Sequence, residues 1–545
     1  MSSLKYRITR NNLLSRTAVI IYSLIISAST AAGILFDRGK SLQTMKVRGF
    51  AVLILCTLAA VPVLSALINL LCGAICSRAK KEFSPGKEPE PAAGIYKKYF
   101  PVSFVIIMAC WAVVWLAYYP GLFNYDVGFQ IDQFLTGEYN TQYPLIHTLL
   151  LGKCYQTGAA SGNPEAGLIL YEVIQCSFCA FVFSLTCTFI RSTAKTNFLY
   201  YPALAFYALF PVHSILALST TKDVLFSAFI LLSILILFEL KRVSQNRHRL
   251  MLSCMEVISL MMVLLLRNNA IFCLAAVLII ILPLPVGNKR NAVVILLASI
   301  SLYFCLNQVM IRTLSAESVP LKEALSIPAQ QFGRIYQIKG ESDRESGYMM
   351  YQYLDPAQGV YDPHISDRMK YFLKISRADQ LPGLLDVSFR LFMKYKAISL
   401  DSLLYTNEGL WYLWDTSHAD IYPGLYRGGY LLTYIEGGYG ISPDSKLPAL
   451  ERFLEKLVTE NEYQKIPLIS LFFAPAFYVY LFLFSFFVLI SKKKFSCSPY
   501  TYIYLSLFFL LLTIIAGPCI LIRYLYPFAA AAPVFIWLVF KSAGS

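Results

Sequence analysis

Residues 101–133 read PVSFVIIMACWAVVWLAYYPGLFNYDVGFQIDQ, an apolar run followed at once by a polar loop. The apolar part, 101–119, matches the length of about 20 residues that a helix needs to cross the hydrocarbon core of a bilayer. The loop then places Asp126, Gln130 and Asp132 directly at the membrane surface. Ionisable groups in such a position cost desolvation free energy and are candidates for function by default. This stretch therefore predicts a membrane protein with chemistry at one surface.

The same length criterion finds about twelve apolar runs along the chain. They lie at 17–36, 50–75, 101–119, 166–190, 198–218, 224–240, 250–266, 269–286, 292–311, 467–490, 499–516 and 524–541. The runs are too long and too uniformly apolar for barrel strands, and a helix satisfies its own backbone hydrogen bonds in lipid. With 57% hydrophobic and 14% charged residues, we expect an all-α polytopic membrane protein with about twelve transmembrane helices.

Basic residues follow a pattern along the connections, and they account for the net charge of +15. Lys and Arg crowd alternate loops, which by the positive-inside rule marks the cytoplasmic face and places both termini inside. The outer loop that contains Arg38 and Arg48 is an exception. Because the charges are scattered among short tethers rather than gathered in one patch, nucleic-acid binding is not expected. The 13 cysteines lie mostly in apolar runs without a disulfide or zinc spacing.

This topology divides the chain into three parts. Residues 1–311 are expected to form about nine transmembrane helices, interrupted by the outer loop 120–165. Residues 312–466 are long enough for a mainly helical extracytoplasmic domain, with helical stretches near 367–397 and 447–463. Residues 467–545 would add about three more transmembrane helices. Aromatic side chains of the outer domain serve either for stacking on sugar rings or as interfacial belt and domain core. They are Trp411, Tyr412, Trp414, Tyr422, Tyr426, Tyr430, Tyr434 and Tyr439.

Asp126 is the best placed acid of the outer loop 120–165. Asp126, Gln130 and Gln133 recur at helical spacing, so a helix would place them on one face, with Asp132 off that face. A carboxylate at this surface can accept a proton from an incoming hydroxyl, or it can hold a divalent cation. A helix cap or a solvated loop acid is the structural alternative, and it weighs more for Asp132 than for Asp126.

Two further polar residues are candidates with a strong structural alternative. Pro144 is expected to open a helix over 145–151 with His147 in its first turn. His147 is as plausible in a structural hydrogen bond as in catalysis. Gln330 lies in Ile327-Pro328-Ala-Gln330-Gln331, just after a predicted span, where it offers an amide to a ligand or simply belongs to a turn that enters a helix.

Three basic residues from separate hairpins are predicted to meet on the outer face. They are Lys222, next to Asp223 at the start of a span, Arg267, and Arg523, which is followed by Tyr524. A phosphate needs such a set, because guanidinium groups form bidentate hydrogen bonds with it. Asp223 is expected to cap its helix and leave Lys222 to meet an anion. Snorkelling to lipid headgroups is the alternative for each residue singly.

The arrangement resembles the GT-C superfamily of polytopic glycosyltransferases, which take sugars from polyprenyl-phosphate donors. The resemblance rests on Pro120-Gly-Leu-Phe-Asn-Tyr-Asp126 after a span, on Tyr143-Pro-Leu-Ile-His147 opening the next helix, and on Arg523-Tyr-Leu-Tyr-Pro527. The resemblance covers the whole topology. Among the members of the superfamily, the chain looks most similar to uncharacterised bacterial proteins. A GT-C-like fold is the expectation that follows.

In that superfamily the first acid of the outer loop acts as base or metal ligand, which implies such a role for Asp126. Basic residues at outer helix ends hold the donor phosphate, which implies Lys222, Arg267 and Arg523. This chain lacks the adjacent acids or double proline that many members carry, since Asp126 and Asp132 are separated and Tyr143 precedes Pro144. A divalent cation, Mg²⁺ or Mn²⁺, is therefore an open question.

The function expected is transfer of a sugar from a polyprenyl-phosphate donor to an extracytoplasmic glycan, lipid or protein, with the active site outside a cell membrane. Three alternatives stay open. A glycan polymerase or ligase would share the chemistry but use a diphosphate donor. A lipid-linked sugar flippase would need polar residues along its helices, which only Glu172, Glu239, Glu256 and a few others approach. A membrane scaffold would need no chemistry at all.

Overall fold

The computed structural model describes residues 13–83, 92–123, 125–340, 342–354, 361–414, 439–458, 467–496 and 499–544. In this part of the chain the structure is helical, and β pairing is limited to isolated bridges. Within the same residues, eight helices are long and apolar enough to cross a membrane. They are α2 (Arg16–Asp37), α3 (Val47–Phe83), α4 (Ala92–Ala117), α7 (Pro164–Thr193), α10 (Lys222–Arg242), α11 (Asn246–Leu266), α13 (Lys289–Thr313) and α24 (Ile522–Gly544). The chain is therefore an all-α, multi-pass membrane protein.

The remaining apolar segments differ from the uninterrupted spans that the hydropathy predicts. The run 198–218 is two helices, α8 (Tyr200–Leu209) and α9 (Pro211–Leu218), bent by 50°. Pro211 causes this break, because proline has no N–H for the helical ladder. Pro475 likewise separates α21 (Pro467–Phe473) from α22 (Pro475–Ser491). Two further apolar helices, α12 (Ala270–Ile281) and α23 (Tyr500–Ile515), are shorter than 18 residues.

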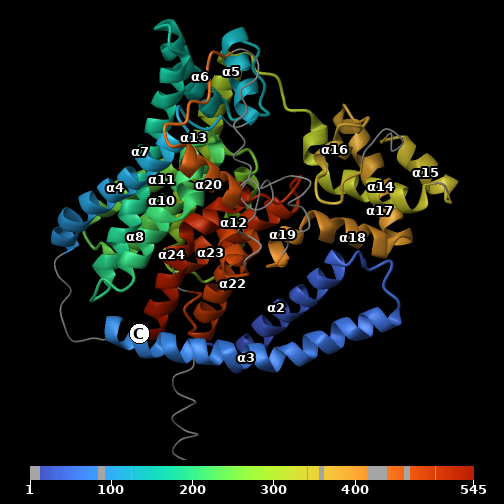
Figure 1. Ribbon diagram of the computed structural model, residues 1–545, viewed down its shortest axis with the longest axis horizontal. Coiled ribbons are helices and arrows are strands. Elements are labelled where there is room, and N and C mark those ends of the chain that lie inside the picture. Colours follow the sequence, from blue (N-terminus) through green and yellow to red (C-terminus); the bar gives the residue numbers. More distant parts are fainter. Residues whose placement is uncertain are drawn as a thin grey trace, which may run out of the picture.

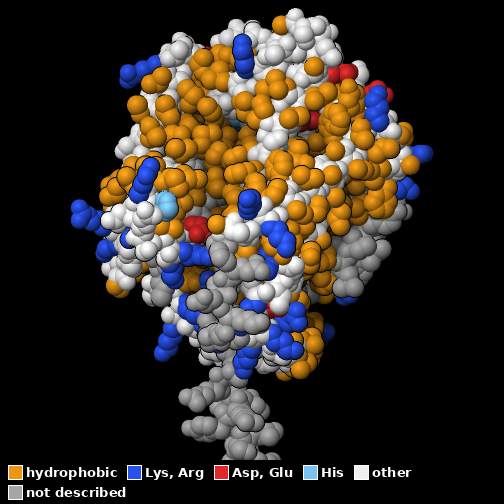
Figure 2. Space-filling view, turned by 90° about the vertical axis from the view of Figure 1, so that its left-hand side faces the viewer, with side chains coloured by type: hydrophobic (Ala, Val, Ile, Leu, Met, Phe, Trp, Pro, Cys, Tyr) orange, Lys and Arg blue, Asp and Glu red, His pale blue; other side chains and the backbone are white. Residues whose placement is uncertain are grey.

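The central bundle packs around aromatic side chains of the broken span. Tyr207 of α8 stacks on Phe183 of α7 at 4.2 Å between ring centroids, and its hydroxyl donates to Ala530 O at 2.6 Å. Figure 1 shows α7, α10, α11 and α24 side by side in this bundle, and α2 and α3 as a hairpin that packs on α22 and α24. Figure 2 shows a broad apolar face on which Lys and Arg gather toward the lower part, as expected for a surface in lipid with a basic margin.

The segment 312–466, which we call the outer segment after its predicted side, has a hydrophobic core of its own, built by residues between Leu325 and Ile398. Its elements are η1 (Leu321–Ala324), α14 (Ser326–Lys339), α15 (Arg344–Tyr351), α16 (Asp367–Lys370), η2 (Ala378–Gln380), α17 (Leu381–Lys394), α18 (Lys396–Thr406), α19 (Glu408–Trp411) and α20 (Pro448–Val458). Helices α14 to α18 stand to one side of the bundle (Figure 1). They are joined to it through Ser366 N, which donates to Pro518 O at 2.8 Å, and Asn407 Nδ2, which donates to Ile515 O at 3.3 Å.

Candidate functional site

The outer loop after α4 is fixed by main-chain contacts rather than by a long strand pairing. Leu122 forms a parallel bridge with Ser219, and Leu122 O accepts from Thr220 N at 3.1 Å. Leu122 N in turn donates to Glu172 Oε1 at 3.0 Å. Gly121 precedes this contact with φ 154°, and a Cβ there would lie 1.7 Å from the Glu172 oxygen. These contacts place the starts of two helices, α5 (Tyr125–Thr136) and α10, next to each other.

Helix α5 carries the polar residues of the loop as the spacing predicts. Asp126 lies in its first turn, while Gln130 and Gln133 are buried on the same side. Asp132 points elsewhere, and its Oδ1 accepts from the Tyr439 hydroxyl at 2.6 Å. The helix predicted after Pro144 is also present, as α6 (Leu145–Ala160), and it extends beyond the predicted end.

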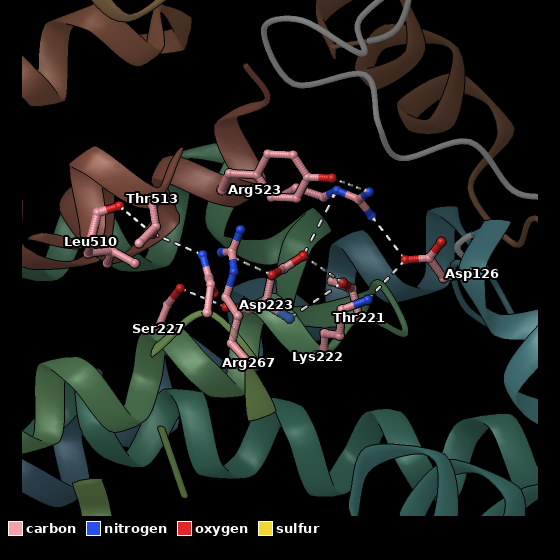
Figure 3. A network of polar contacts seen from close by, with 11 residues as sticks. Asp126, Thr221, Lys222, Asp223, Ser227, Arg267, Leu510, Thr513 and Arg523 are labelled. Carbon is pink, nitrogen blue, oxygen red and sulfur yellow. Dashed lines mark hydrogen bonds and ion pairs between the residues drawn. The ribbon is translucent and has the colours of Figure 1, made fainter. Parts of the chain in front are cut away.

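Five charged side chains from four segments of the chain meet in one place, and we call them the charge cluster (Figure 3). Lys222 Nζ lies 3.2 Å and Arg523 Nη1 3.8 Å from Asp126 Oδ2. On the other side, Arg267 Nη1 lies 3.3 Å from Asp223 Oδ1, and Arg523 Nε lies 3.9 Å from Asp223 Oδ2. Arg523 thus stands between two carboxylates. Three cationic and two anionic groups leave the cluster with one excess positive charge.

The pairing within the charge cluster corrects two expectations. Thr221, not Asp223, caps α10: its hydroxyl accepts from Asp223 N at 3.5 Å, and Asp223 lies one residue into the helix. Lys222 is already paired in this structure, with Asp126. The physical reason is that the bridge at Leu122 brings α5 onto the same end of α10, so that Asp126 is the nearest counter-charge.

Aromatic rings and an amide contact enclose the cluster: Tyr143 lies 5.2 Å from Lys222 Nζ, and Phe226 lies 5.4 Å from the Arg267 guanidinium. Tyr524 packs against two guanidinium groups, with Arg267 at 4.9 Å and Arg523 at 5.0 Å from its ring centroid. Beside Arg267, Asn269 Nδ2 donates to Thr513 Oγ1 at 2.9 Å, which joins α12 to α23. A ring between two cations shields them from water and strengthens their field at the site.

The middle of the charge cluster is buried, and its exposure is greatest on the Asp126 side, with Arg267 at 14%. The Asp223 and Arg523 side chains are 2% and 3% exposed, whereas Asp126 and Lys222 are 18% and 19% exposed. Burial raises the pKa of the Asp126 carboxyl, but the charges of Lys222 and Arg523 lower it by more, so its pKa lies below the usual range. Asp126 is therefore ionised at neutral pH and faces the open side of the cluster.

His147 lies in a buried chain of hydrogen bonds, which we call the neutral relay. Its Nδ1 lies 2.8 Å from the Gln130 amide, and its Nε2 2.7 Å from the Tyr171 hydroxyl. Tyr171 donates to Gln175 Oε1 at 2.8 Å, and Gln175 Nε2 donates to Ser219 O at 2.6 Å. Because Tyr171 gives its proton to Gln175, neutral His147 donates from Nε2, and its unprotonated Nδ1 then pairs with Gln130 only when the NH₂ group of that side-chain amide faces it. Burial, reinforced by the charge of Lys222, lowers the pKa of His147 to about 3, so the ring is neutral.

The other candidates of the sequence have places of their own. Gln330 is buried in the outer segment, where its Nε2 donates to Asp362 O at 2.9 Å and Thr406 Oγ1 at 3.0 Å. Tyr412 hydrogen-bonds to Asp37 at 2.7 Å, which fits the packing role for the aromatic residues. Four of those residues lie outside the described residues, namely Tyr422, Tyr426, Tyr430 and Tyr434.

Three members of the site escaped the sequence reasoning: Thr221, Tyr171 and Gln175. Thr221 had a visible signal, because a Thr directly before a predicted helix is a preferred N-cap. Tyr171 and Gln175 lie four residues apart within an apolar run, and nothing in that pattern separates them from ordinary polar residues of a transmembrane helix. Within the described residues, no group of three or more His, Cys, Asp or Glu side chains is arranged to hold a metal ion.

Comparison with known proteins gives one family match. Residues 134–371 match the model of a family of unknown function, DUF6020. The matched segment contains His147, Lys222, Asp223, Arg267 and Gln330, and it excludes Asp126 and Arg523. No curated protein and no solved structure matches the chain. The site must therefore be interpreted from its own geometry.

Proposed function

We propose that the protein is a membrane glycosyltransferase that moves a sugar from a polyprenyl-phosphate donor to an acceptor outside the membrane. The observation that carries this proposal is the charge cluster itself. Basic side chains from three separate hairpins converge beside a partly open carboxylate at one end of a set of transmembrane helices. A lipid-linked phosphate reaches such a place from the bilayer, and a hydroxyl acceptor reaches it from the open side.

Arg267 supports a phosphate site by its unsatisfied hydrogen bonding. Its Nη1 is buried and has no hydrogen-bond partner among the described residues, although it faces Asp223 Oδ1 at 3.3 Å. A buried guanidinium N–H without a hydrogen bond is costly and calls for a partner. A phosphate oxygen is an acceptor of the right charge for it.

In the proposed reaction, the hydroxyl oxygen of the acceptor attacks the anomeric carbon of the sugar. Asp126 accepts the proton of that hydroxyl group. The bond between that carbon and the phosphate oxygen breaks, and polyprenyl phosphate leaves with the bonding electrons. Lys222, Arg267 and Arg523 stabilise the growing negative charge in a site that is shielded from water. General-base catalysis of this kind typically contributes about 10²–10⁴ in rate.

Donor binding would also strengthen the base. In the free protein Lys222 and Arg523 face Asp126 and lower the pKa of its carboxyl. A phosphate that takes over these two cations removes part of that effect, while burial remains and raises the pKa. Asp126 would thus become a better proton acceptor only when the donor is in place. His147 acts as a positioning residue in this proposal, since both of its ring nitrogens are engaged in the neutral relay.

The site does not fit a divalent cation at Asp126, because its carboxylate already faces two cationic side chains. The proposed reaction accordingly contains no metal step. The proposal includes about twelve membrane crossings, a GT-C-like fold, cytoplasmic termini and an extracytoplasmic site. The positive-inside pattern supports this orientation.

A transfer assay in nanodiscs tests the proposal. Radiolabelled polyprenyl-phosphate sugars are incubated with extracted cell-envelope material and with wild type, Asp126→Asn or Glu138→Gln. Glu138→Gln is the matched control, because it makes the same change at an exposed residue near the end of α5. Label should leave the donor lipid with wild type and Glu138→Gln but not with Asp126→Asn. Near-normal transfer by folded Asp126→Asn would falsify the role of the base, and donor translocation without transfer would favour the flippase.

A further inference from the structure

An apolar pocket extends from the Arg267 end of the charge cluster into the membrane region, and we call it the α10–α12 pocket. It has a volume of about 50 Å³ and lies between α10, α11, α12 and α23. Its wall on α10 runs from Phe226 to Leu237 at helical spacing, a length of about 17 Å. Phe226 contacts the Arg267 guanidinium at 5.4 Å, and Leu510 belongs to both the pocket wall and the surroundings of the cluster (Figure 3).

A second apolar pocket lies beneath the Asp126 side, between α4 and α7, and we call it the α4–α7 pocket. It has a volume of about 150 Å³. Trp111, Ala112 and Trp115 line it from α4, Glu172 from α7, and Leu218 from the end of α9. The contact surface is almost wholly apolar, since the Glu172 carboxyl is buried against the loop.

The α4–α7 pocket is connected to Asp126 through hydrogen bonds to the backbone of Leu122. Glu172 and Leu218, both wall residues, accept hydrogen bonds from Leu122 N at 3.0 and 3.4 Å. Leu122 precedes Asp126 by four residues, and Leu218 precedes Lys222 by four. Two wall residues thus hold the backbone four residues before Asp126, and one of them, Leu218, lies four residues before Lys222.

The two pockets therefore adjoin opposite ends of one charged site. Figure 3 shows Asp126 at one end of the cluster and Leu510 and Thr513 at the other. The phosphate is expected at the end with the two arginines, so the donor chain fits the α10–α12 pocket. A second pocket for a hydrocarbon chain, on the side of the base, has no use if the acceptor is a water-soluble glycan.

We infer that the acceptor is also a lipid, with its hydroxyl at Asp126 and its hydrocarbon chain in the α4–α7 pocket. This inference rests on the proposed function and specifies its substrate class. The reaction is then a transfer between two lipids: the acceptor O–H proton goes to Asp126, the sugar bond to phosphate breaks, and a glycolipid and polyprenyl phosphate result. Both substrates arrive laterally from the bilayer.

The first test asks which product carries the sugar. Labelled polyprenyl-phosphate sugar and total envelope extract are incubated with wild-type protein in nanodiscs, and the products are separated by organic extraction after mild acid cleavage of unreacted donor. Label in a new organic-soluble glycolipid is expected. Label only in aqueous glycan or in protein overturns the inference but leaves the proposed function intact, whereas no transfer to any fraction overturns both.

The second test locates the acceptor chain with matched variants. Ala112→Phe fills the α4–α7 pocket, while Val113→Phe adds a ring to the neighbouring residue, which is exposed and outside the pocket. With the purified acceptor fraction, Ala112→Phe should raise the KM for the acceptor by about tenfold, as expected for about two methylene groups excluded from apolar contact. The KM for the donor should not change.

Ser506→Phe, which fills the α10–α12 pocket, should produce the reverse pattern, with a raised KM for the donor alone. Equal KM values for the acceptor in Ala112→Phe and Val113→Phe would refute the pocket assignment. A readout without turnover is photolabelling with a diazirine-bearing phospholipid in the nanodisc. Label on Glu172 in Val113→Phe but not in Ala112→Phe supports a chain in the pocket, and the absence of label in both variants contradicts it.

Discussion

Two sets of contacts join α5 to the segment 217–222. One set consists of ionised side chains, and the other consists of uncharged hydrogen-bonding groups. The charge cluster uses ionised groups whose closest atoms are 3.2 to 3.9 Å apart. The neutral relay from Gln130 to Ser219 uses uncharged groups whose hydrogen bonds are 2.6 to 2.8 Å long. The same two pieces of chain are therefore held both loosely by charge and tightly by short hydrogen bonds.

Because of this difference, the charge cluster can exchange its ion-pair partners, whereas the neutral relay cannot. An ion contact without strong directional demands can pass from a carboxylate to a phosphate with little rearrangement. A buried chain of satisfied hydrogen bonds resists any change, because each broken link leaves a polar group unpaired. The relay thus fixes where Asp126 and Lys222 stand, and the cluster is where a substrate can act.

The largest effect is expected from Arg523→Gln, because Arg523 lies between both carboxylates of the cluster. Loss of a buried charge partner costs up to about 3–5 kcal/mol of stability, since it leaves Asp126 with Lys222 alone and Asp223 with Arg267 alone. Transfer should fall by at least about 10²-fold, as for other groups that stabilise charge in a transition state. Thermal unfolding in detergent and the transfer assay measure the two effects.

The double variant Arg523→Gln/Asp223→Asn separates these effects. It removes one negative charge along with the positive one and should recover most of the stability while transfer stays low. If the double variant also recovers transfer, Arg523 is a structural residue and the phosphate site lies elsewhere.

A smaller loss of turnover is expected from the relay. Tyr171→Phe leaves His147 Nε2 and Gln175 Oε1 without a partner, which should cost about 1–3 kcal/mol of stability. Turnover should fall by less than about tenfold, and the pH profile should keep its shape, because His147 is neutral at working pH. A pH profile that changes in Tyr171→Phe or His147→Gln would show that the imidazole takes part in proton transfer.

The pH dependence of turnover should report the protonation state of Asp126, first in the free protein and then in the donor complex. In the free protein the pKa of Asp126 is lowered, so the acid limb of kcat/KM should lie below the usual aspartate value of about 3.9. The ion pairs of Asp126 likewise stabilise the fold at neutral pH and lose this effect as the pH falls through the lowered pKa. The acid limb of kcat, which reports the complex, should lie at higher pH because the donor takes over Lys222 and Arg523.

Lys222→Met provides the control for this exchange. The variant removes the closest cation from Asp126 in the free protein, so the acid limb of its kcat/KM should move up toward that of kcat. Coincident limbs in the wild type would argue against any exchange of cations between carboxylate and phosphate.

The smallest effect is expected at the second acid of α5. Asp132 accepts a hydrogen bond from Tyr439 at 2.6 Å, away from the cluster. Asp132→Asn should therefore change transfer by less than about threefold and stability by at most about 1 kcal/mol. Tyr439→Phe should match it in both measurements. A loss comparable to that of Asp126→Asn would move the base to Asp132 and contradict the structural role given to this pair.

Much of the helical framework can be predicted from the sequence, because long apolar runs indicate membrane-spanning helices. The spacing of Asp126, Gln130 and Gln133 predicts α5, and Pro144 predicts the start of α6. The convergence of Lys222, Arg267 and Arg523 also follows, since alternating hairpins place all three at the same ends of their helices. These features depend on local pattern and on the number of intervening spans.

The pairing inside the site is not accessible in the same way. That Lys222 meets Asp126 depends on the bridge at Leu122, a contact between segments almost 100 residues apart. Tyr171 and Gln175 lie in an apolar run, and only the packing of α6 on α7 reveals that they continue from His147. Pro211 is present in the sequence as a possible helix break, but a hydropathy average over the run 198–218 does not reveal that the helix bends there.

The close approach of Gly121 to Glu172 links the changes that this sequence can accept at the two positions. A side chain at residue 121 collides with the carboxyl group that holds Leu122, so Gly121→Ala is harmful in the present background. After Glu172→Ala, which removes that carboxyl group, the same substitution meets only the backbone preference for glycine at this φ. Loss of the glycine is therefore less costly once the glutamate is gone, and we expect the two positions to change together.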